Sequence, residues 1–201
     1  MSRSLPTSCI RPERKIRHFS AAFLVLPAIS VLQTIDNFPG LLNKSGVKWV
    51  NDILIGDEKV AGVIAHSHLQ GEKVVSVAIG IGLNVESAPD NVSDSFVKSA
   101  GYLNDYLADE ERLDVGSVFR MLIRKLADNY MSVLEGQYQR LLEVYIKRSI
   151  ILEKRDKVMT DSLTADEREI IDGKVYRIGN DLELYFENRS EPVTNGRLML
   201  L

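Results

Sequence analysis

One short stretch of the sequence combines side chains that could together bind an anionic small molecule. It reads VKWVNDILIGDEKVAGVIAHS over residues 47–67 and is followed by VVSVAIGIGLNV over residues 74–85. Lys59 could neutralise a phosphate or a carboxylate, while Asn51 and Asp52 add an amide and a carboxylate nearby. The chemistry indicated is electrostatic stabilisation of a negatively charged ligand or transition state.

Three glycines in the same stretch support this interpretation. Gly62 lies in the middle of an apolar run, where it weakens a strand unless something must approach the backbone closely. Gly80, Gly82 and Asn84 close the next apolar run. Because consecutive antiparallel strands bring the start of one beside the end of the other, we expect Lys59 and these residues to share one edge of a sheet.

Each of these residues also has an ordinary structural explanation. Lys48 and Lys59 could be solvated, Asn51 and Asp52 could form a turn, and Gly62 could mark a bulge. Their occurrence together and in this order favours a binding site.

His66 and His68 are a second candidate, for a metal site. They project from the same side of a predicted strand, but neither has a cysteine or a carboxylate close in sequence. The sequence therefore does not favour a metal site here.

A three-stranded antiparallel meander is predicted to position the candidate residues. The β-branched runs DILI, KVAGVIAHS and VVSVAIGIGLNV begin at residues 52, 59 and 74 and are separated by the turns GDE and LQGE. The third run is apolar on both faces until its glycines. We therefore expect it in the middle of a sheet that is covered on each side, with a helix on one face.

The N-terminal part is predicted to supply that helix. Residues 1–20 read as an extended or irregular segment, and Ser20 is expected to cap a helix over residues 21–35, in which Pro27 causes a kink or displaces the start. Residues 36–46 collect Asp, Asn, Pro, Gly and Ser, which predicts a loop.

Two further helices are predicted behind the meander. An apolar stripe predicts a helix over residues 118–134, with Asp114 or Ser117 as its N-cap. Gly136 interrupts the stripe, and a second, shorter stripe covers residues 138–146. The overall expectation is an α+β fold, with a mixed or antiparallel sheet packed by helices.

The C-terminal part returns to strand patterns. Predicted strands are SIILEKR, KVMTD, GKVYRIG, LELYFEN and GRLMLL, with turns at GND and NG. So many short strands in some fifty residues predict a small SH3-like β-barrel. We place the boundary near Arg148, giving domains over residues 1–148 and 149–201.

Composition excludes several classes of function. The net charge of −3 supplies no basic field for nucleic acid. Cys9 is the only cysteine, so no internal disulfide forms and a reducing compartment, the cytoplasm, is expected. The longest apolar run begins at Ala21 and is too short to span a bilayer. The basic residues before it are not followed by a cleavage site, so neither a signal peptide nor a membrane partner is predicted.

Taken together, the stretch VKWVNDILIGDEKVAGVIAHS and the strand end GIGLN resemble the catalytic core of biotin protein ligases. That family carries a Lys-Trp-Pro-Asn-Asp motif, a hairpin leading to Lys-x-x-Gly, and a Gly-x-Gly-x-Asn strand end. LLEVYIKRS and the strand-rich tail also look like the passage into the family's SH3-like C-terminal domain. The resemblance covers about residues 20–201 and implies a class II synthetase-like catalytic core.

The resemblance implies an activity and a set of partners. The family activates biotin with ATP and Mg²⁺ to biotinyl-5'-AMP, then transfers the biotinyl group to a lysine of a biotin carboxyl carrier domain. A homodimer is compatible with the resemblance.

The resemblance also implies roles for individual residues. Lys59 and Asp52 match catalytic positions, with Lys59 near the adenylate phosphate and Asp52, together with Asn51, on the nucleotide and metal side. The glycines Gly62, Gly80 and Gly82 match backbone that lines the biotin pocket. Asn84 matches a contact to the adenine end, and Lys48 is the first residue of the motif.

Two departures from the family pattern bear on activity. Val50 replaces the motif proline. The family's Gly/Arg-rich loop, which closes over the adenylate, belongs upstream of the Lys-Trp motif and is not found in this chain, and neither is a winged-helix repressor domain. The chain is therefore expected to be the C-terminal part of a ligase. A non-catalytic ligase homologue that keeps the fold and a lipoate-type ligase remain open alternatives.

Overall fold

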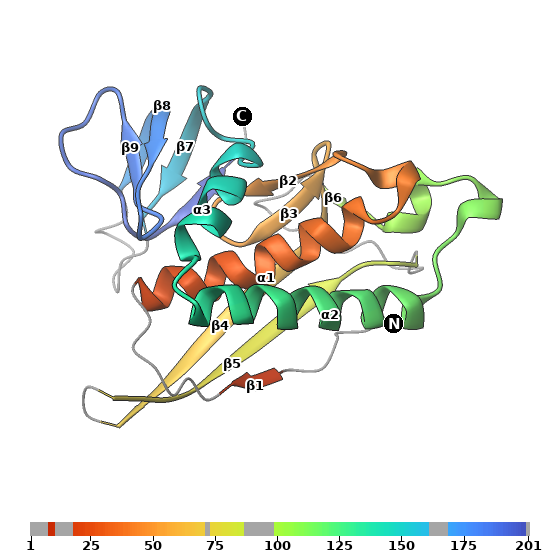
Figure 1. Cartoon of the computed structure of the whole chain (residues 1–201). Helices are drawn as coiled ribbons and strands as arrows, with labels where there is room; N and C mark the ends of the chain where they lie inside the picture. The colour runs from red at the N-terminus through yellow and green to blue at the C-terminus, as the bar shows by residue number, and fades with distance from the viewer. Residues whose placement is uncertain (1–7, 11–17, 71–72, 87–98, 161–168, 200–201) are drawn as a thin grey trace.

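The computed structural model describes residues 8–10, 18–70, 73–86, 99–160 and 169–199 (Figure 1). Helices and two antiparallel sheets make up the described part, as the α+β prediction requires. The larger sheet has six strands and the smaller, C-terminal sheet has four.

The larger sheet contains the predicted meander. Its strands are β1 (Ser8–Ile10), β2 (Ser45–Lys48), β3 (Asp52–Ile55), β4 (Glu58–Gln70), β5 (Lys73–Leu83) and β6 (Ser99–Ala100). The order is β1-β5-β4-β3-β2, and β6 pairs in parallel with the start of β4. The three predicted strands are confirmed as β3, β4 and β5, each antiparallel to the next.

Two strands of this sheet were not predicted. β1 pairs with β5 within the segment that was expected to be extended or irregular, with no strand pairing assigned to it. β2 pairs with β3 and begins at Ser45, so the predicted loop over residues 36–46 extends too far. Its central part does fold as a short 3₁₀ turn, η1 (Pro39–Leu41). Pairing with a neighbouring strand overrides the local turn preference of Ser45 and Gly46.

Helix α1 (Phe19–Asp36) lies at the centre of the molecule. It packs against β2 to β5 on one side and against α2 and α3 on the other (Figure 1). By length and composition alone α1 would suffice to cross a membrane, but 72% of it is buried inside the protein. The predicted Ser20 cap is wrong: the N-cap is His18, which adopts a left-handed conformation and makes no side-chain cap.

The two helices behind α1 agree with the predicted stripes. Helix α2 (Val115–Leu134) is capped by Asp114, whose Oδ2 accepts a hydrogen bond from the Ser117 amide at 2.8 Å. Gly136 follows with a positive φ of 81°, which ends the helix as predicted. Helix α3 (Tyr138–Lys147) comes next, and the short 3₁₀ turns η2 (Leu103–Tyr106) and η3 (Asp109–Glu111) precede α2.

One face of β5 is less covered than the sequence predicts. Val77, Ile79 and Ile81 are buried on the α1 side. On the other face Gly82 is exposed, and Ile64 of β4, which lies opposite Gly80, is 53% exposed. Within the described residues, a helix therefore covers this strand on one side only.

The C-terminal sheet contains β7 (Arg155–Met159), β8 (Ile170–Ile178), β9 (Leu184–Phe186) and β10 (Arg197–Met199). The order is β10-β7-β8-β9, and every pairing is antiparallel. The predicted strand SIILEKR is wrong over most of its length: residues 150–154 form bends and turns, Ser149 makes an isolated bridge to Val47, and only Arg155 belongs to a strand, as the first residue of β7. Barrel closure of the SH3 type and the boundary near Arg148 remain predictions.

Gly46 of β2 packs closely against residues 148–150, the linker that follows α3, and this contact leaves no room for a side chain. A Cβ at Gly46 would lie 2.3 Å from Ile150 Cγ2 and 3.1 Å from the Arg148 carbonyl oxygen. We expect Gly46→Ala to lower the free energy of unfolding by about 1–3 kcal/mol through overpacking, as measured by urea denaturation. Gly82→Ala is the control, because the nearest atom to its Cβ is 4.0 Å away. Equal stability losses would contradict this explanation.

Candidate active site

Four of the predicted site residues form one row across the sheet. In the strand register, Lys48 lies opposite Asp52, Asp52 opposite Gly62, and Gly62 opposite Gly82. Residues directly opposite each other in a sheet present their side chains on the same face. Segments that are separate in the sequence thus converge on one surface, turned away from α1.

Lys59 reaches this surface because β4 is irregular. Ile53 pairs with Ala61 but the next residue, Leu54, pairs with Lys59, so one extra residue is inserted in β4. Such a bulge reverses the alternation of side chains and can redirect one of them. Lys59 therefore lies on the same face as Gly62, although regular alternation would place it on the opposite face.

Lys59 and Asp52 form the central ion pair. Lys59 Nζ lies 2.5 Å from Asp52 Oδ1, and the two side chains are 33% and 19% exposed. A Cβ at Gly62 would lie 3.1 Å from Lys59 Cε and 3.4 Å from Asp52 Oδ1. Gly62 thus provides the space in which the ion pair lies.

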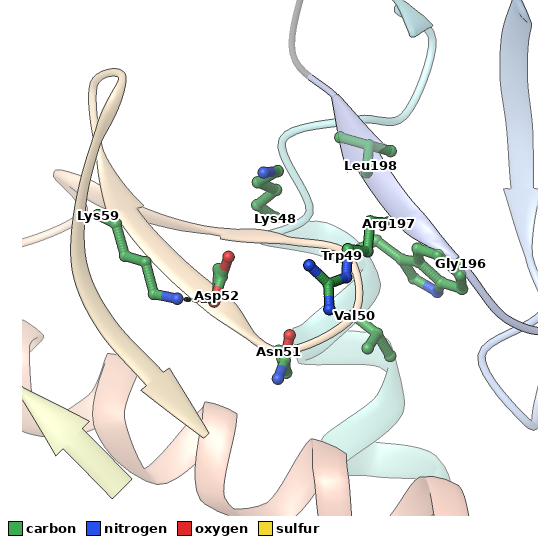
Figure 2. Close-up of a pocket in the computed structure, with 9 residues that line it drawn as sticks. All are labelled: Lys48, Trp49, Val50, Asn51, Asp52, Lys59, Gly196, Arg197 and Leu198. Atoms are coloured by element: carbon green, nitrogen blue, oxygen red, sulfur yellow. Dashed lines mark ion pairs between the residues drawn. The ribbon is translucent and has the colours of Figure 1, made fainter. Parts of the chain in front are cut away.

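Lys59 and Asp52 line a cavity of about 310 Å³. The larger sheet and the C-terminal sheet both line it, as Figure 2 shows. The lining residues are Lys48, Trp49, Val50, Asn51, Asp52, Lys59, Gly196, Arg197 and Leu198. The sequence interpretation missed the last three, which reach the site through the pairing of β10 with β7.

Lys48 is more deeply buried than Lys59, the other lysine of the motif. Only 2% of it is exposed, and in Figure 2 its side chain points away from the Lys59–Asp52 pair. Its charge acts on Asp156 of β7, where burial raises the pKa of the carboxyl group while Lys154 and Lys48 act to lower it. Lys48 therefore contributes positive potential between the two sheets.

Asn51 is held in place by the neighbouring strand. Its Nδ2 donates to the Val63 carbonyl oxygen at 2.7 Å, and the Val63 amide donates to the Asn51 carbonyl oxygen at 3.0 Å. Trp49, two residues earlier, donates its indole N–H to the Leu182 carbonyl oxygen at 2.7 Å. The peptide bond between Trp49 and Val50 is cis.

Four predicted site residues, Gly62, Gly80, Gly82 and Asn84, are not among those that line the cavity. Gly80 lies opposite Ile64, farther along the open face, and Gly82 ends the cross-strand row. Asn84 donates its side-chain amide to the carbonyl oxygens of Lys59 and Gly101, at 3.3 and 3.1 Å. In this structure Asn84 therefore supports the start of β4, and ligand contacts by these four residues remain predictions.

The two histidines considered for a metal site both lie on β4. His66 and His68 lie exposed on β4. Throughout the described residues, no group of three or more His, Cys, Asp or Glu side chains is arranged to hold a metal ion.

The charges around the cavity indicate the type of ligand that it would bind. Within the described structure, three cationic side chains, Lys48, Lys59 and Arg197, and one carboxylate, Asp52, line the cavity. An excess of fixed positive charge in a partly enclosed pocket suits a phosphate or carboxylate.

Comparison with known proteins agrees with this chemistry. Residues 9–84 match the model of the Biotin/lipoate A/B protein ligase family. The chain is 32% identical over 99 residues to the bifunctional ligase/repressor BirA of Bacillus subtilis, covering 49% of this chain and 29% of that protein. It is 34% identical over 71 residues to the biotin--[acetyl-CoA-carboxylase] ligase of Paracoccus denitrificans, covering 35% and 30%. The chain thus spans less than a third of these curated relatives.

Solved structures with a similar fold extend the likeness to almost the whole chain. Biotin protein ligase from Aquifex aeolicus, as an R40G mutant in complex with biotin, superposes with a TM-score of 0.73 at 15% identity. The match covers 97% of this chain and 76% of that chain. The same enzyme in complex with biotin and ATP gives a TM-score of 0.73 at 15% identity, covering 96% and 75%.

Proposed function

Since the chain is a relative of the biotin protein ligases in sequence and in fold, we propose that it takes part in biotin ligation. In this proposal the chain binds biotin and ATP, activates biotin to biotinyl-5'-AMP, and transfers the biotinyl group to a lysine of a carboxyl carrier domain. The single observation that carries the proposal is the Lys59–Asp52 pair at the mouth of a cation-rich cavity, within the segment that matches the family.

Activation of biotin requires stabilisation of negative charge. A carboxylate oxygen of biotin attacks the α-phosphorus of ATP, a new P–O bond forms, and the bond to the leaving pyrophosphate breaks. Lys59 is a fixed cation beside this position, and its ammonium can stabilise the charge that develops on the phosphoryl oxygens. Because Asp52 already orients the Lys59 ammonium, little reorganisation is needed when the ligand binds.

Asp52 is also the residue suited to hold Mg²⁺. Magnesium is usually bound by one or two carboxylates together with substrate phosphates, and Asp52 is the one carboxylate among the described residues that line the cavity. The ion would neutralise phosphate charge when bound. One carboxylate oxygen of Asp52 would then bind the ion, and the other would keep its contact with Lys59.

The acceptor protein for the biotinyl group is inferred from the same relatives. A Paracoccus denitrificans relative is named a biotin--[acetyl-CoA-carboxylase] ligase, which points to a carboxylase as the acceptor. A lysine amine of the acceptor would attack the activated carbonyl of the adenylate and release AMP. Lys59 would again stabilise negative charge, now on the departing phosphate.

Adenylate formation tests this proposal. The chain would be incubated with ATP, Mg²⁺ and either biotin or lipoate, and the acyl-adenylate would be detected by mass spectrometry. We expect biotinyl-5'-AMP and equimolar pyrophosphate. Lipoyl-AMP alone would replace the substrate assignment, and no adenylate with either acid would overturn catalysis by this chain.

Arg197 is expected to contribute to nucleotide affinity. Its guanidinium enters the same cavity from β10 and can make charge-assisted hydrogen bonds to phosphate. Loss of one such interaction corresponds to roughly tenfold weaker binding, so we expect Arg197→Ala to raise the dissociation constant for ATP about tenfold in calorimetry. The control is Arg177→Ala, because Arg177 lies over the Tyr185 ring in the same sheet. Equal effects of the two substitutions would contradict a phosphate contact.

A further inference from the structure

We propose that α3 positions the catalytic motif and that Tyr145 is the positioning residue through which it does so. This inference rests on the proposed function for its effect on ligands, but not for its structural readout. Tyr145 lies in a helix that follows the family-matching segment, residues 9–84.

Tyr145 contacts the motif through its hydroxyl group. The hydroxyl donates to the Val50 carbonyl oxygen at 2.8 Å, and the Tyr145 side chain is fully buried. Burial raises the pKa of the Tyr145 hydroxyl far above its usual range, so the group remains a donor. Val50 directly precedes Asn51 and Asp52, and the direction of its carbonyl therefore affects how both residues enter β3.

The C-cap residue of α3, Arg148, contacts the start of β2, the strand that leads into the motif. Arg148, three residues after Tyr145 and so on the same side of the helical chain, donates to the Ser45 carbonyl oxygen from Nε at 3.1 Å and from Nη2 at 2.6 Å. Its Nη1 also pairs with Asp36 at the end of α1, at 2.5 Å. Helix α3 therefore contacts residue 50 through Tyr145, and its C-cap residue Arg148 contacts residue 45, the first residue of β2.

A third contact holds Trp49, the residue before Val50. The Trp49 indole donates to the carbonyl oxygen of Leu182, which adopts a left-handed conformation with φ 66°. Trp49, Val50 and Asn51 are thus held by hydrogen bonds to three different elements. Each bond involves a backbone carbonyl, so each restrains the course of the chain as well as the position of a side chain.

Trp49 provides a direct readout because it is the only tryptophan in the chain. We expect Tyr145→Phe to shift Trp49 emission to longer wavelength and to increase its quenching by acrylamide, with no ligand present. The phenylalanine ring preserves the packing, and far-UV circular dichroism would confirm the fold. The dissociation constant for biotinyl-5'-AMP should rise about tenfold, corresponding to one buried hydrogen bond.

Tyr138→Phe is the matched control. Tyr138 lies on the same helix and donates its hydroxyl to a backbone carbonyl oxygen, that of Asn180, at 2.7 Å. Loss of this bond should lower the melting temperature, but the Val50 carbonyl keeps its partner. Adenylate affinity should therefore change much less than in Tyr145→Phe; it is the quantity compared, because Asn180 lies in the turn whose Leu182 carbonyl oxygen accepts the Trp49 indole hydrogen bond. Equal losses of adenylate affinity in the two variants would overturn the assignment of Tyr145.

Arg148→Lys provides a second, independent test. Lysine keeps the charge but cannot reproduce the forked contacts of arginine with Ser45 and Asp36. We expect Trp49 emission to shift in the same direction as in Tyr145→Phe, which also decides the question if that variant does not fold. Unchanged emission in folded variants at both positions would contradict the proposal. If the wild type binds no adenylate, the proposed function fails, while the emission data still decide the role of α3.

Discussion

Replacing Lys59 by alanine should lower the rate of biotinyl-5'-AMP formation by about 10²–10³-fold, because it removes a preorganised charge at the site of phosphoryl transfer. Lys59 is only partly buried and its ion pair with Asp52 lies at the mouth of the cavity. We therefore expect the folded structure to persist. The measurement is the initial rate of pyrophosphate release at saturating biotin and ATP.

Lys174→Ala is the matched control for this experiment. Lys174 is also ion-paired, with Glu153 at 2.5 Å and Glu187 at 3.2 Å, but it lies in the C-terminal sheet and does not line the cavity. Its replacement removes the same charge and the same kind of ion pair, and should leave the rate nearly unchanged. An unchanged rate in Lys59→Ala, or an equal loss in both variants, would show that Lys59 has no catalytic role.

Replacing Gly62 by valine should reduce the turnover number by about 10²-fold, the effect of displacing a catalytic group by about 1 Å. A Cβ at this position already lies 3.2 Å from Lys59 Nζ, and the two methyl groups of valine extend farther. Lys59 would have to move away from Asp52. Gly62→Ala should give a smaller loss in the same direction, because it adds the Cβ alone.

Ala78→Val tests whether added bulk on this face is sufficient to cause the loss. Ala78 pairs with His66 on the same face of the β4–β5 hairpin, away from the ion pair. Steady-state kinetics should show normal turnover for Ala78→Val. Normal turnover in Gly62→Val as well would mean that the space at Gly62 is not needed for catalysis.

Local sequence patterns were sufficient to predict the elements that carry the motif. The β-branched runs and their turns predicted β3, β4 and β5, and the apolar stripes predicted α2 and α3 with the Asp114 cap. The errors lie where tertiary contacts override local preference. Ser45 and Gly46 are typical of turns, yet they form β2 because β3 pairs with one side of them and the linker after α3 contacts the other.

The candidate site was predictable only where its residues share one hairpin. Lys59, Asp52 and Gly62 belong to adjacent strands, so antiparallel pairing brings them near one another, but the bulge that puts Lys59 on the same face as Gly62 was not predicted. Arg197 could not be predicted, because it reaches the cavity through β10, whose place depends on pairing in a separate sheet. Tyr145 was recognised as part of an apolar stripe, but a stripe does not indicate where a hydroxyl group finds its acceptor.

Calorimetric titration of biotinyl-5'-AMP into the wild type and into Lys59→Ala tests the central claim most directly, since it measures binding at the cavity without requiring turnover. We predict saturable binding of one molecule per wild-type chain and clearly weaker binding to Lys59→Ala, with Lys174→Ala matching the wild type. No binding to the wild type, or equal affinity for the wild type and Lys59→Ala, would contradict the assignment of this cavity as an adenylate site.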